Sequence, residues 1–308
     1  MPSSTYILCP GQGAQIVGMG RDFFEANKHA RETFDVANAV LGFDLSTLCF
    51  EGPEDRLNGT DISQPAIYVT SVACHRASLH AGKIDPTQVT AYAGLSLGEY
   101  TALHLAGVFT FEDGLKLVAA RGRYMQDAAV ASPSGMVAIM GADEAAITKL
   151  CDENRGSDVL VPANFNAPGQ IVVSGSRAAC ERVLPAAEAA GFKAVALKVA
   201  GAFHSPLMQP AADTMKGELA RVTFAAPTTP VYSNVTAKLH DAASMKDLLV
   251  QQIVSPVRWE QTMVPLASET DARFIELAPG RTLAGLMKRI NRRLPIESLA
   301  TADALVVA

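Results

Sequence analysis

Short apolar runs alternate with helical patterns in the N-terminal part of the chain. Tyr6–Cys9 and Val89–Ala93 are apolar runs typical of buried strands, while Leu97–Leu105 and Phe111–Ala128 carry apolar residues at helical spacing. The long and mostly apolar stretch Ile62–His80 predicts a further helix. Because strands alternate with helices, the pattern favours an α/β fold with a mostly parallel sheet covered by helices.

The middle of the chain has a different order of elements. Its pattern predicts a strand, a helix, two strands, a helix and a strand, over Met136–Met140, Ala142–Glu153, Val159–Asn164, Gln170–Ser174, Arg177–Ala190 and Lys193–Val199. This β-α-β-β-α-β order is typical of a ferredoxin-like unit. We therefore expect residues 131–199 to form a small lobe, inserted into a large lobe made of residues 1–130 and 200–308. A cleft between two lobes is a common place for a ligand.

The α/β pattern resumes in the last third of the chain. Ser205-Pro206 is typical of a helix start, with serine at the N-cap and proline in the first turn. The remaining pattern predicts a helix, two strands and a closing helix, over Pro206–Val222, Val231–Asn234, Phe274–Leu277 and Thr282–Ile290.

Composition narrows the class of protein. The 308 residues are 49% hydrophobic and 19% charged, which is enough to bury a core. The net charge of -5 argues against a nucleic-acid partner, and no apolar run approaches the ~18 residues that span a bilayer. Five scattered cysteines without a Cys-x-x-Cys pair argue against a disulfide framework or a zinc site. Without a signal peptide at Met1–Leu8, we expect a reduced, cytoplasmic enzyme that binds no metal.

Ser96 is the first candidate for chemistry. Gly94-Leu95-Ser96-Leu97-Gly98 matches the G-x-S-x-G elbow, with an expected strand before it and an expected helix after it. The small flanking residues allow a tight turn, and the serine falls at a helix N-terminus that favours negative charge. The alternative is a structural turn, since the motif alone is loose.

His204 is the candidate base, because a serine needs a base to lose its proton. It follows Gly201-Ala202-Phe203 at the end of an expected strand, where open α/β proteins build their sites. His104 lies too far along its helix to reach Ser96, and we expect His240 to be solvated in a polar loop. From these residues alone, a base and a structural histidine remain open readings of His204.

Arg121 is the candidate charge partner. It borders the apolar stripe of the helix Phe111–Ala128, so we expect it to be partly buried, whereas Arg123 points to solvent. A buried guanidinium needs an anionic partner. That partner is either an internal carboxylate or a substrate carboxylate held by the planar fork of the arginine.

The turn Pro10–Gln15 follows the first expected strand. It is not a P-loop, because no Gly-Lys-Ser/Thr follows it. It is either a tight turn between a strand and a helix, or the source of a backbone N–H donor for an oxyanion hole that faces Ser96.

Seven short motifs, kept in one order over nearly the whole chain, resemble the malonyl-CoA:acyl-carrier-protein transacylase family. The motifs are Pro10–Gln15, Gly94–Tyr100, Arg121-Gly122, Asn166–Gln170 with Val173–Gly175, Gly201–His204, Ser255–Trp259 and Pro279-Gly280. Each motif is weak alone, but seven in order are highly specific. The resemblance implies a hydrolase-like large lobe with an inserted ferredoxin-like lobe.

The resemblance also implies an activity. A malonyl group would pass from malonyl-CoA through Ser96 to the phosphopantetheine thiol of a holo acyl carrier protein. We expect no permanently bound cofactor, and we expect a monomer because nothing in the sequence requires more than one chain. His204 would act as base and Arg121 would hold the malonyl carboxylate. The alternatives are a thioester hydrolase with the same Ser-His pair, a trans-acting polyketide acyltransferase, and a non-catalytic acyl-binding protein.

The family implies roles for four further residues. The backbone amides of Gln12 and Leu97 would form the oxyanion hole. The backbone carbonyl of Gln252 would orient the histidine in place of the acidic third member of a Ser-His-Asp triad. Asn166, from the fourth motif, would bind substrate.

Two residues bear on the choice of acyl group. Phe203 stands before the histidine as in malonyl-selecting relatives, and it would fill the space that an α-methyl group needs. Steric selection against one methyl group contributes about 1–3 kcal/mol. Leu95 departs from the histidine that the family usually has before the serine. The substitution removes a possible donor near the substrate carboxylate, so the sequence leaves the acyl preference open.

Overall fold

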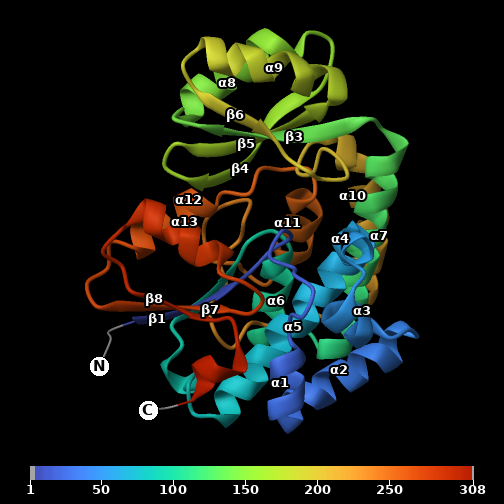
Figure 1. The fold of residues 1–308 in the computed structure, drawn as a ribbon, viewed down its shortest axis with the longest axis vertical. Helices are drawn as coiled ribbons and strands as arrows, with labels where there is room; N and C mark the ends of the chain where they lie inside the picture. The colour runs from blue at the N-terminus through green and yellow to red at the C-terminus, as the bar shows by residue number, and fades with distance from the viewer. Residues whose placement is uncertain (1–3, 307–308) are drawn as a thin grey trace.

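The computed structural model describes residues 4–306, which form two sheets with their own helices, one above the other (Figure 1). The chain leaves the first sheet after α7 (Phe111–Ala131) and returns to it after β6 (Lys193–Ala196). We call the elements from β3 to β6 the small lobe and all the others the large lobe. The division predicted at residues 131 and 199 falls at the last residue of α7 and just after β6, and its exact position stays a prediction.

The sheet of the large lobe is parallel throughout, as the alternating pattern predicts. Its strands run in the order β2, β1, β7, β8, with bounds β1 Ser4–Cys9, β2 Ala91–Gly94, β7 Ala272–Leu277 and β8 Ile296–Leu299. β1 lies between β2 and β7, with Tyr6 paired with Ala91 on one side and Phe274 on the other. Ile7 and Leu8 are fully buried on opposite faces of the sheet. Helices therefore have to cover both faces.

Helices cover both faces of this sheet (Figure 1). They are α1 Arg21–Ala26, α2 Lys28–Leu41, α3 Leu45–Glu51, α4 Glu54–Asn58, α5 Thr60–His80, α6 Leu97–Leu105, α7 Phe111–Ala131, α10 Gln209–Arg221, α11 Met245–Gln252, α12 Trp259–Leu266 and α13 Thr282–Ile290, with 3-10 turns at Pro86–Gln88, Pro206–Met208 and Ala302–Leu305. The apolar helix α5 is buried along nearly its whole length and packs against α7. Between residues 4 and 306, no helix has the length and apolar character needed to cross a bilayer.

The small lobe is an antiparallel sheet covered by two helices. Its strands run in the order β4, β5, β3, β6, with bounds β3 Ser134–Met140, β4 Leu160–Ala167, β5 Gln170–Ser176 and β6 Lys193–Ala196. α8 (Glu144–Arg155) and α9 (Arg177–Ala189) cover the face that points away from the large lobe (Figure 1). The order of elements and of strands is that of the predicted ferredoxin-like unit.

The loop before α12 joins the two lobes. Val257 exchanges backbone hydrogen bonds with β4, donating to the Ala163 carbonyl and accepting from the Phe165 amide, both at 2.9 Å. The next residue, Arg258, lies 5.3 Å from the ring centre of Phe165 and 3.6 Å from a carboxylate oxygen of Glu144. The Ser255–Trp259 motif therefore holds the small lobe against the large one.

Two expected elements differ in the structure. Val231–Asn234 is not a strand: Val231 makes a single bridge to Tyr92, and the chain then turns back, with Ser233 donating to the Lys238 carbonyl. The expected helix Pro206–Val222 is interrupted: Ser205 caps a 3-10 turn as predicted, but α10 starts only at Gln209. Pro210 then occupies the first turn of α10, where a missing backbone N–H costs nothing.

Candidate active site

Ser96 lies on a sharp turn between β2 and α6, where the G-x-S-x-G motif predicts it. Its backbone has φ 53° and ψ -105°, a conformation that is costly for a residue with a side chain. The flanking glycines explain why the turn can form. A Cβ atom on Gly94 would lie 1.9 Å from the carbonyl carbon of Gly98, and one on Gly98 would lie 2.1 Å from the carbonyl oxygen of Cys9. The strained turn lifts the serine side chain toward the space between the lobes.

His204 contacts Ser96 directly. Its Nε2 lies 2.8 Å from the Ser96 Oγ, and its Nδ1 lies 2.8 Å from the backbone carbonyl oxygen of Gln252. A carbonyl can only accept, so Nδ1 carries the hydrogen and Nε2 is left as the acceptor. The serine hydroxyl therefore donates to a nitrogen that is ready to take its proton. Of the two readings of His204, the geometry favours the base.

The surroundings of His204 keep the imidazole neutral. Burial, followed by the positive charge of Arg121, lowers its pKa to about 4, and backbone hydrogen bonds to Gln252 and Ser255 offset part of this shift. A neutral imidazole at pH 7 is the form that can accept a proton.

Arg121 is more deeply buried than expected, at 1% exposed. Its Nη1 donates to Gln64 Oε1 at 2.7 Å, and its Nη2 donates to Gln252 Oε1 at 2.9 Å and to Ser96 Oγ at 3.1 Å. All these partners are neutral, and no carboxylate of residues 4–306 forms an ion pair with it. Burial lowers the pKa of Arg121, but an arginine stays protonated at neutral pH. The internal salt bridge that the sequence left open is absent from the described chain, and a cation stands beside the serine.

The two residues expected to form the oxyanion hole are Leu97, which follows Ser96 in the chain, and Gln12, in the turn after β1. Leu97 opens α6, where backbone amides lack acceptors within the helix, and Gln12 lines the same pocket as Ser96. The amide of Ser96 itself is already used, because it donates to Asn234 Oδ1 at 2.6 Å.

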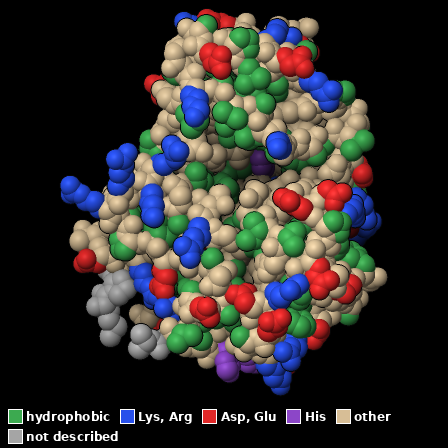
Figure 2. Space-filling view, in the orientation of Figure 1, with side chains coloured by type: hydrophobic (Ala, Val, Ile, Leu, Met, Phe, Trp, Pro, Cys, Tyr) green, Lys and Arg blue, Asp and Glu red, His purple; other side chains and the backbone are tan. Residues whose placement is uncertain are grey.

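A cavity of about 530 Å³ opens over Ser96 and His204. Figure 2 shows the surface hollowed between the two lobes, with a histidine visible at the bottom of the hollow. The large lobe supplies the floor of the cavity, and β4, β5 and the chain after β6 supply the roof through Asn164, Asn166, Gln170, Val172, Leu197 and Lys198. The structure thus brings a nucleophile, a base and a cation to the junction of the lobes.

Beside Arg121, the three other residues expected to touch the substrate also line this cavity. Phe203 is 6% exposed, and its carbonyl accepts a 2.5 Å hydrogen bond from Ser174, which holds the backbone beside His204. Leu95 lines the cavity beside Ser96. Asn166 lines it from the small lobe, with its buried Oδ1 free of any partner in the described chain.

The expectation that His240 is solvated is wrong. Its side chain is fully buried, and its Nε2 lies 2.6 Å from Oε1 of Glu99, a fully buried glutamate on α6. The polar residues around His240 made it look exposed, but Glu99, 141 positions earlier in the chain, gives it a partner. Sequence reasoning also missed Asn234, which holds the elbow by donating to the Gly94 carbonyl at 2.7 Å. One sequence feature could have indicated the pair of Glu99 and His240. Glu99 directly follows Gly98 and lies on the buried face of the short helix α6, where a carboxylate needs a hydrogen-bonding partner.

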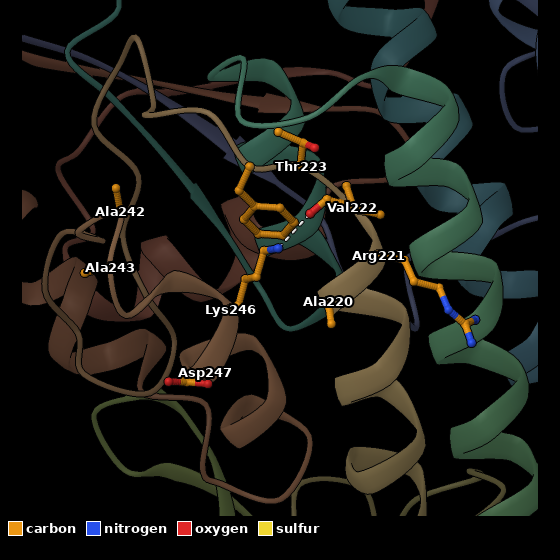
Figure 3. Close-up of a pocket in the computed structure, with 9 residues that line it drawn as sticks. Ala220, Arg221, Val222, Thr223, Ala242, Ala243, Lys246 and Asp247 are labelled. Atoms are coloured by element: carbon orange, nitrogen blue, oxygen red, sulfur yellow. Dashed lines mark hydrogen bonds between the residues drawn. The ribbon is translucent and has the colours of Figure 1, made fainter.

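A second cavity, of about 550 Å³, offers no comparable chemistry (Figure 3). It lies where the end of α10 meets α11, and the residues that line it include no histidine, serine or cysteine. Lys246 is occupied there, because it donates to the Val222 carbonyl at 2.7 Å (Figure 3). Its Nζ also lies 4.9 Å from the ring centre of Phe224. Among residues 4–306, no group of three or more histidine, cysteine or acidic side chains is arranged to hold a metal ion.

Comparison with known proteins agrees with this geometry. The acyl transferase domain model matches residues 5–303. The malonyl CoA-acyl carrier protein transacylase of Salmonella typhimurium is 43% identical over 301 residues, which are 97% of this chain and 96% of the relative. The solved transacylase of Coxiella burnetii is 38% identical with a TM-score of 0.94, over 99% of this chain and 96% of that one. A malonyl-transacylase solved in complex with a type II PKS acyl-carrier protein is 39% identical with a TM-score of 0.92, over 98% of both chains. The chain therefore belongs to the malonyl CoA-acyl carrier protein transacylase family.

Proposed function

We propose that this protein transfers a malonyl group from malonyl-CoA to the phosphopantetheine thiol of an acyl carrier protein, through a malonyl ester on Ser96. The observation that carries the proposal is the position of Arg121, a buried guanidinium 3.1 Å from the Ser96 oxygen with only neutral partners. A buried cation favours an anionic ligand. The malonyl carboxylate, two carbons from the thioester carbonyl, supplies that anion when the carbonyl is at the serine.

In the first half-reaction, His204 Nε2 takes the proton of Ser96 Oγ as the oxygen attacks the thioester carbonyl of malonyl-CoA. The amides of Gln12 and Leu97 stabilise the negative oxygen of the tetrahedral intermediate. The carbon–sulfur bond then breaks, and the coenzyme A sulfur leaves with the proton from His204. The malonyl ester remains on Ser96, with its carboxylate on Arg121.

In the second half-reaction, the same groups act in reverse. His204 takes the proton of the phosphopantetheine thiol, and the sulfur attacks the ester carbonyl. The ester bond breaks, Ser96 recovers its proton from His204, and malonyl leaves on the carrier. The Gln252 carbonyl holds Nδ1–H throughout, so Nε2 alone exchanges protons.

The pocket also supports a choice among acyl groups. Phe203 lies beside His204 on the cavity wall, where its ring fills the space next to the α-carbon of a bound malonyl group. Asn166 offers its unpartnered Oδ1 to an N–H donor of the substrate. Leu95, in place of a histidine, leaves Arg121 as the group that recognises the carboxylate.

A single chain carries the whole set of reacting groups, so we propose that the protein acts as a monomer and needs no permanently bound cofactor. All five cysteines are free and buried. Free thiols are typical of a reducing compartment, which supports a cytoplasmic location.

The relative that was solved with a type II PKS carrier keeps polyketide synthesis open as the pathway, beside fatty-acid synthesis. The two pathways share the acyl-loading step and differ in the carrier that accepts the malonyl group. Transfer rates to a fatty-acid carrier and to a polyketide carrier, measured side by side, distinguish them.

Intact-protein mass spectrometry after brief incubation with malonyl-CoA tests the proposal. We expect a malonyl adduct on the native protein, no adduct on Ser96→Ala, and loss of the adduct when holo carrier protein is added. Acetyl-CoA in parallel shows whether the carboxylate is required.

Two outcomes would contradict the proposal. Steady release of free coenzyme A without an adduct would indicate a thioester hydrolase. Neither adduct nor release would indicate an acyl-binding protein without activity.

A further inference from the structure

We propose that Glu99 is a positioning residue for Arg121, whose guanidinium is the clamp for the malonyl carboxylate. Its buried carboxylate fixes which end of the Gln252 side-chain amide faces Arg121, and so holds the guanidinium in place for the substrate carboxylate. The inference rests on the proposed role of Arg121 and assigns a function to a buried acid that does not touch the reacting atoms.

Glu99 is fully buried on α6, three residues after Ser96. Its Oε2 accepts hydrogen bonds from Gln252 Nε2 at 2.6 Å and from the backbone N–H of Asn234 at 3.2 Å, while Oε1 lies 2.6 Å from His240 Nε2. An ionised carboxylate can only accept hydrogen bonds. Each of its three neighbours must therefore present a donor to it.

This requirement decides the orientation of Gln252. Its Nε2 donates to Glu99 Oε2 and, at 2.9 Å, to the backbone carbonyl of Ser96, so its Oε1 is left to accept from Arg121 Nη2 at 2.9 Å. The reversed amide would place its oxygen against two oxygens and its N–H groups against a guanidinium, which has donors only. The carboxylate thus makes one orientation the favoured one.

Gln252 links the base, His204, to the cation, Arg121. Its backbone carbonyl holds His204 Nδ1, and its side chain holds Arg121. Gln64 holds the other end of the guanidinium through a neutral oxygen. Glu99 lies beyond the Gln252 amide, so its negative charge acts on Arg121 without occupying an N–H of the fork. A direct Glu–Arg pair would occupy the N–H groups that the substrate needs.

His240 holds the far side of Glu99. Its Nδ1 has no hydrogen-bond partner in the described chain, so its interaction with the site passes through Nε2 and Glu99 Oε1. His240→Gln keeps a donor nitrogen at about the same reach as Nε2. His240→Leu removes the donor and keeps the apolar bulk.

The experiment measures the initial rate of Ser96 malonylation divided by that of Ser96 acetylation, by quenched intact-protein mass spectrometry. We expect Glu99→Gln to lower this ratio at least about tenfold, because a neutral side chain no longer sets the Gln252 amide. The matched control is Glu276→Gln, another fully buried glutamate, whose oxygens accept from the backbone amides of Leu283 and Ala284. None of these three residues lines the active-site pocket. Glu276→Gln should lower the melting temperature and leave the ratio unchanged.

A native ratio in folded Glu99→Gln protein would overturn the inference. Arg121→Ala in the same assay separates this failure from failure of the proposed function. If Arg121→Ala lowers the ratio and Glu99→Gln does not, only the positioning role is wrong. If neither lowers it, the clamp itself is wrong.

The histidine pair carries the test if Glu99→Gln does not fold. We expect His240→Leu to lower the ratio and His240→Gln to restore it. Equal ratios in the two variants would overturn the inference.

Discussion

The floor and the roof of the active-site cavity are built differently. On the floor, which the large lobe supplies, every polar side-chain atom of Ser96, His204 and Gln252 has a protein partner, whereas Nε of the neighbouring Arg121 is a buried donor without a partner in the described chain. On the roof, which the small lobe supplies, Asn166 Oδ1 and Gln170 Oε1 are buried without a partner in the described chain. A buried polar atom without a partner costs about 1–3 kcal/mol.

The difference indicates a division of labour. The floor is preorganised, so its groups need not move when charge develops on the reacting carbonyl. The roof keeps buried acceptors that only a ligand can use. Changes to the floor should therefore lower the rate of acyl transfer, whereas changes to the roof should weaken substrate binding and spare the rate.

The largest effect is expected on the floor at His204. His204→Ala removes the group that takes the serine proton, so single-turnover acylation of Ser96 by malonyl-CoA should slow by at least about 10³-fold. Rapid-quench mass spectrometry measures this rate. Val172→Ala, a substitution on the roof, is the matched control and should retain most of the native rate. A similar loss in both variants would contradict the division between floor and roof.

The site residues that the sequence could predict are those whose chemistry is local. The elbow needs glycines two residues before and after the serine, and the backbone of Gly94 and Gly98 leaves no room for a Cβ atom. Such constraints appear as motifs. Local patterns also identified the parallel sheet and the ferredoxin-like lobe, because strand and helix periods are read over a few residues.

The residues that the sequence could not predict depend on distant pairing. Glu99 and His240 are 141 positions apart, and each looks like an ordinary charged or polar residue until the fold brings them together. The prediction of a strand at Val231–Asn234 is wrong for the same reason. An apolar run becomes a strand only where it pairs with a neighbouring strand over several residues, and Val231 pairs with Tyr92 in a single parallel bridge. The helices α1, α3 and α4 have only 6, 7 and 5 residues, which are too few turns for a clear period.

The second effect, also on the floor, concerns acyl choice. Arg121→Ala should lower the malonylation rate relative to the acetylation rate by about 10- to 100-fold, because a hydrogen-bonded charge contributes about 1.5–3 kcal/mol. Initial rates with the two thioesters measure the ratio. Arg123→Ala on the exposed side of the same helix is the matched control. An unchanged ratio in Arg121→Ala would mean that the guanidinium only supports the fold.

The third effect is expected on the roof. Asn166→Ala removes an acceptor that has no protein partner, so folding should not suffer, and the KM for malonyl-CoA should rise about threefold to tenfold. The kcat should change by less than about twofold, since the reacting groups stay in place. Steady-state kinetics with holo carrier protein separate the two constants. A fall in kcat at constant KM would place Asn166 with the catalytic floor instead.

The smallest effect concerns the acid limit of Ser96 acylation, which the pKa of His204 on the floor sets. Burial and then Arg121 lower the pKa of His204 to about 4, so the imidazole stays neutral, and active as a base, down to pH values where an ordinary histidine with pKa ≈ 6.5 is protonated. The rate of Ser96 acylation at pH 5.5 should therefore remain close to its value at pH 7, whereas an ordinary imidazole would lose about nine-tenths of that rate.

The sign of this shift can be checked with Arg121→Ala. Because the guanidinium lowers the pKa of His204, its removal should move the acid limit of acylation to higher pH. Burial is the larger cause and remains in the variant, so the limit should still lie below that of an exposed histidine. Rapid-quench acylation at constant ionic strength from pH 4.5 to 8 measures both limits, and an acid limit near pH 6.5 in the native protein would show that the floor does not hold His204 in the dry, cationic surroundings described above.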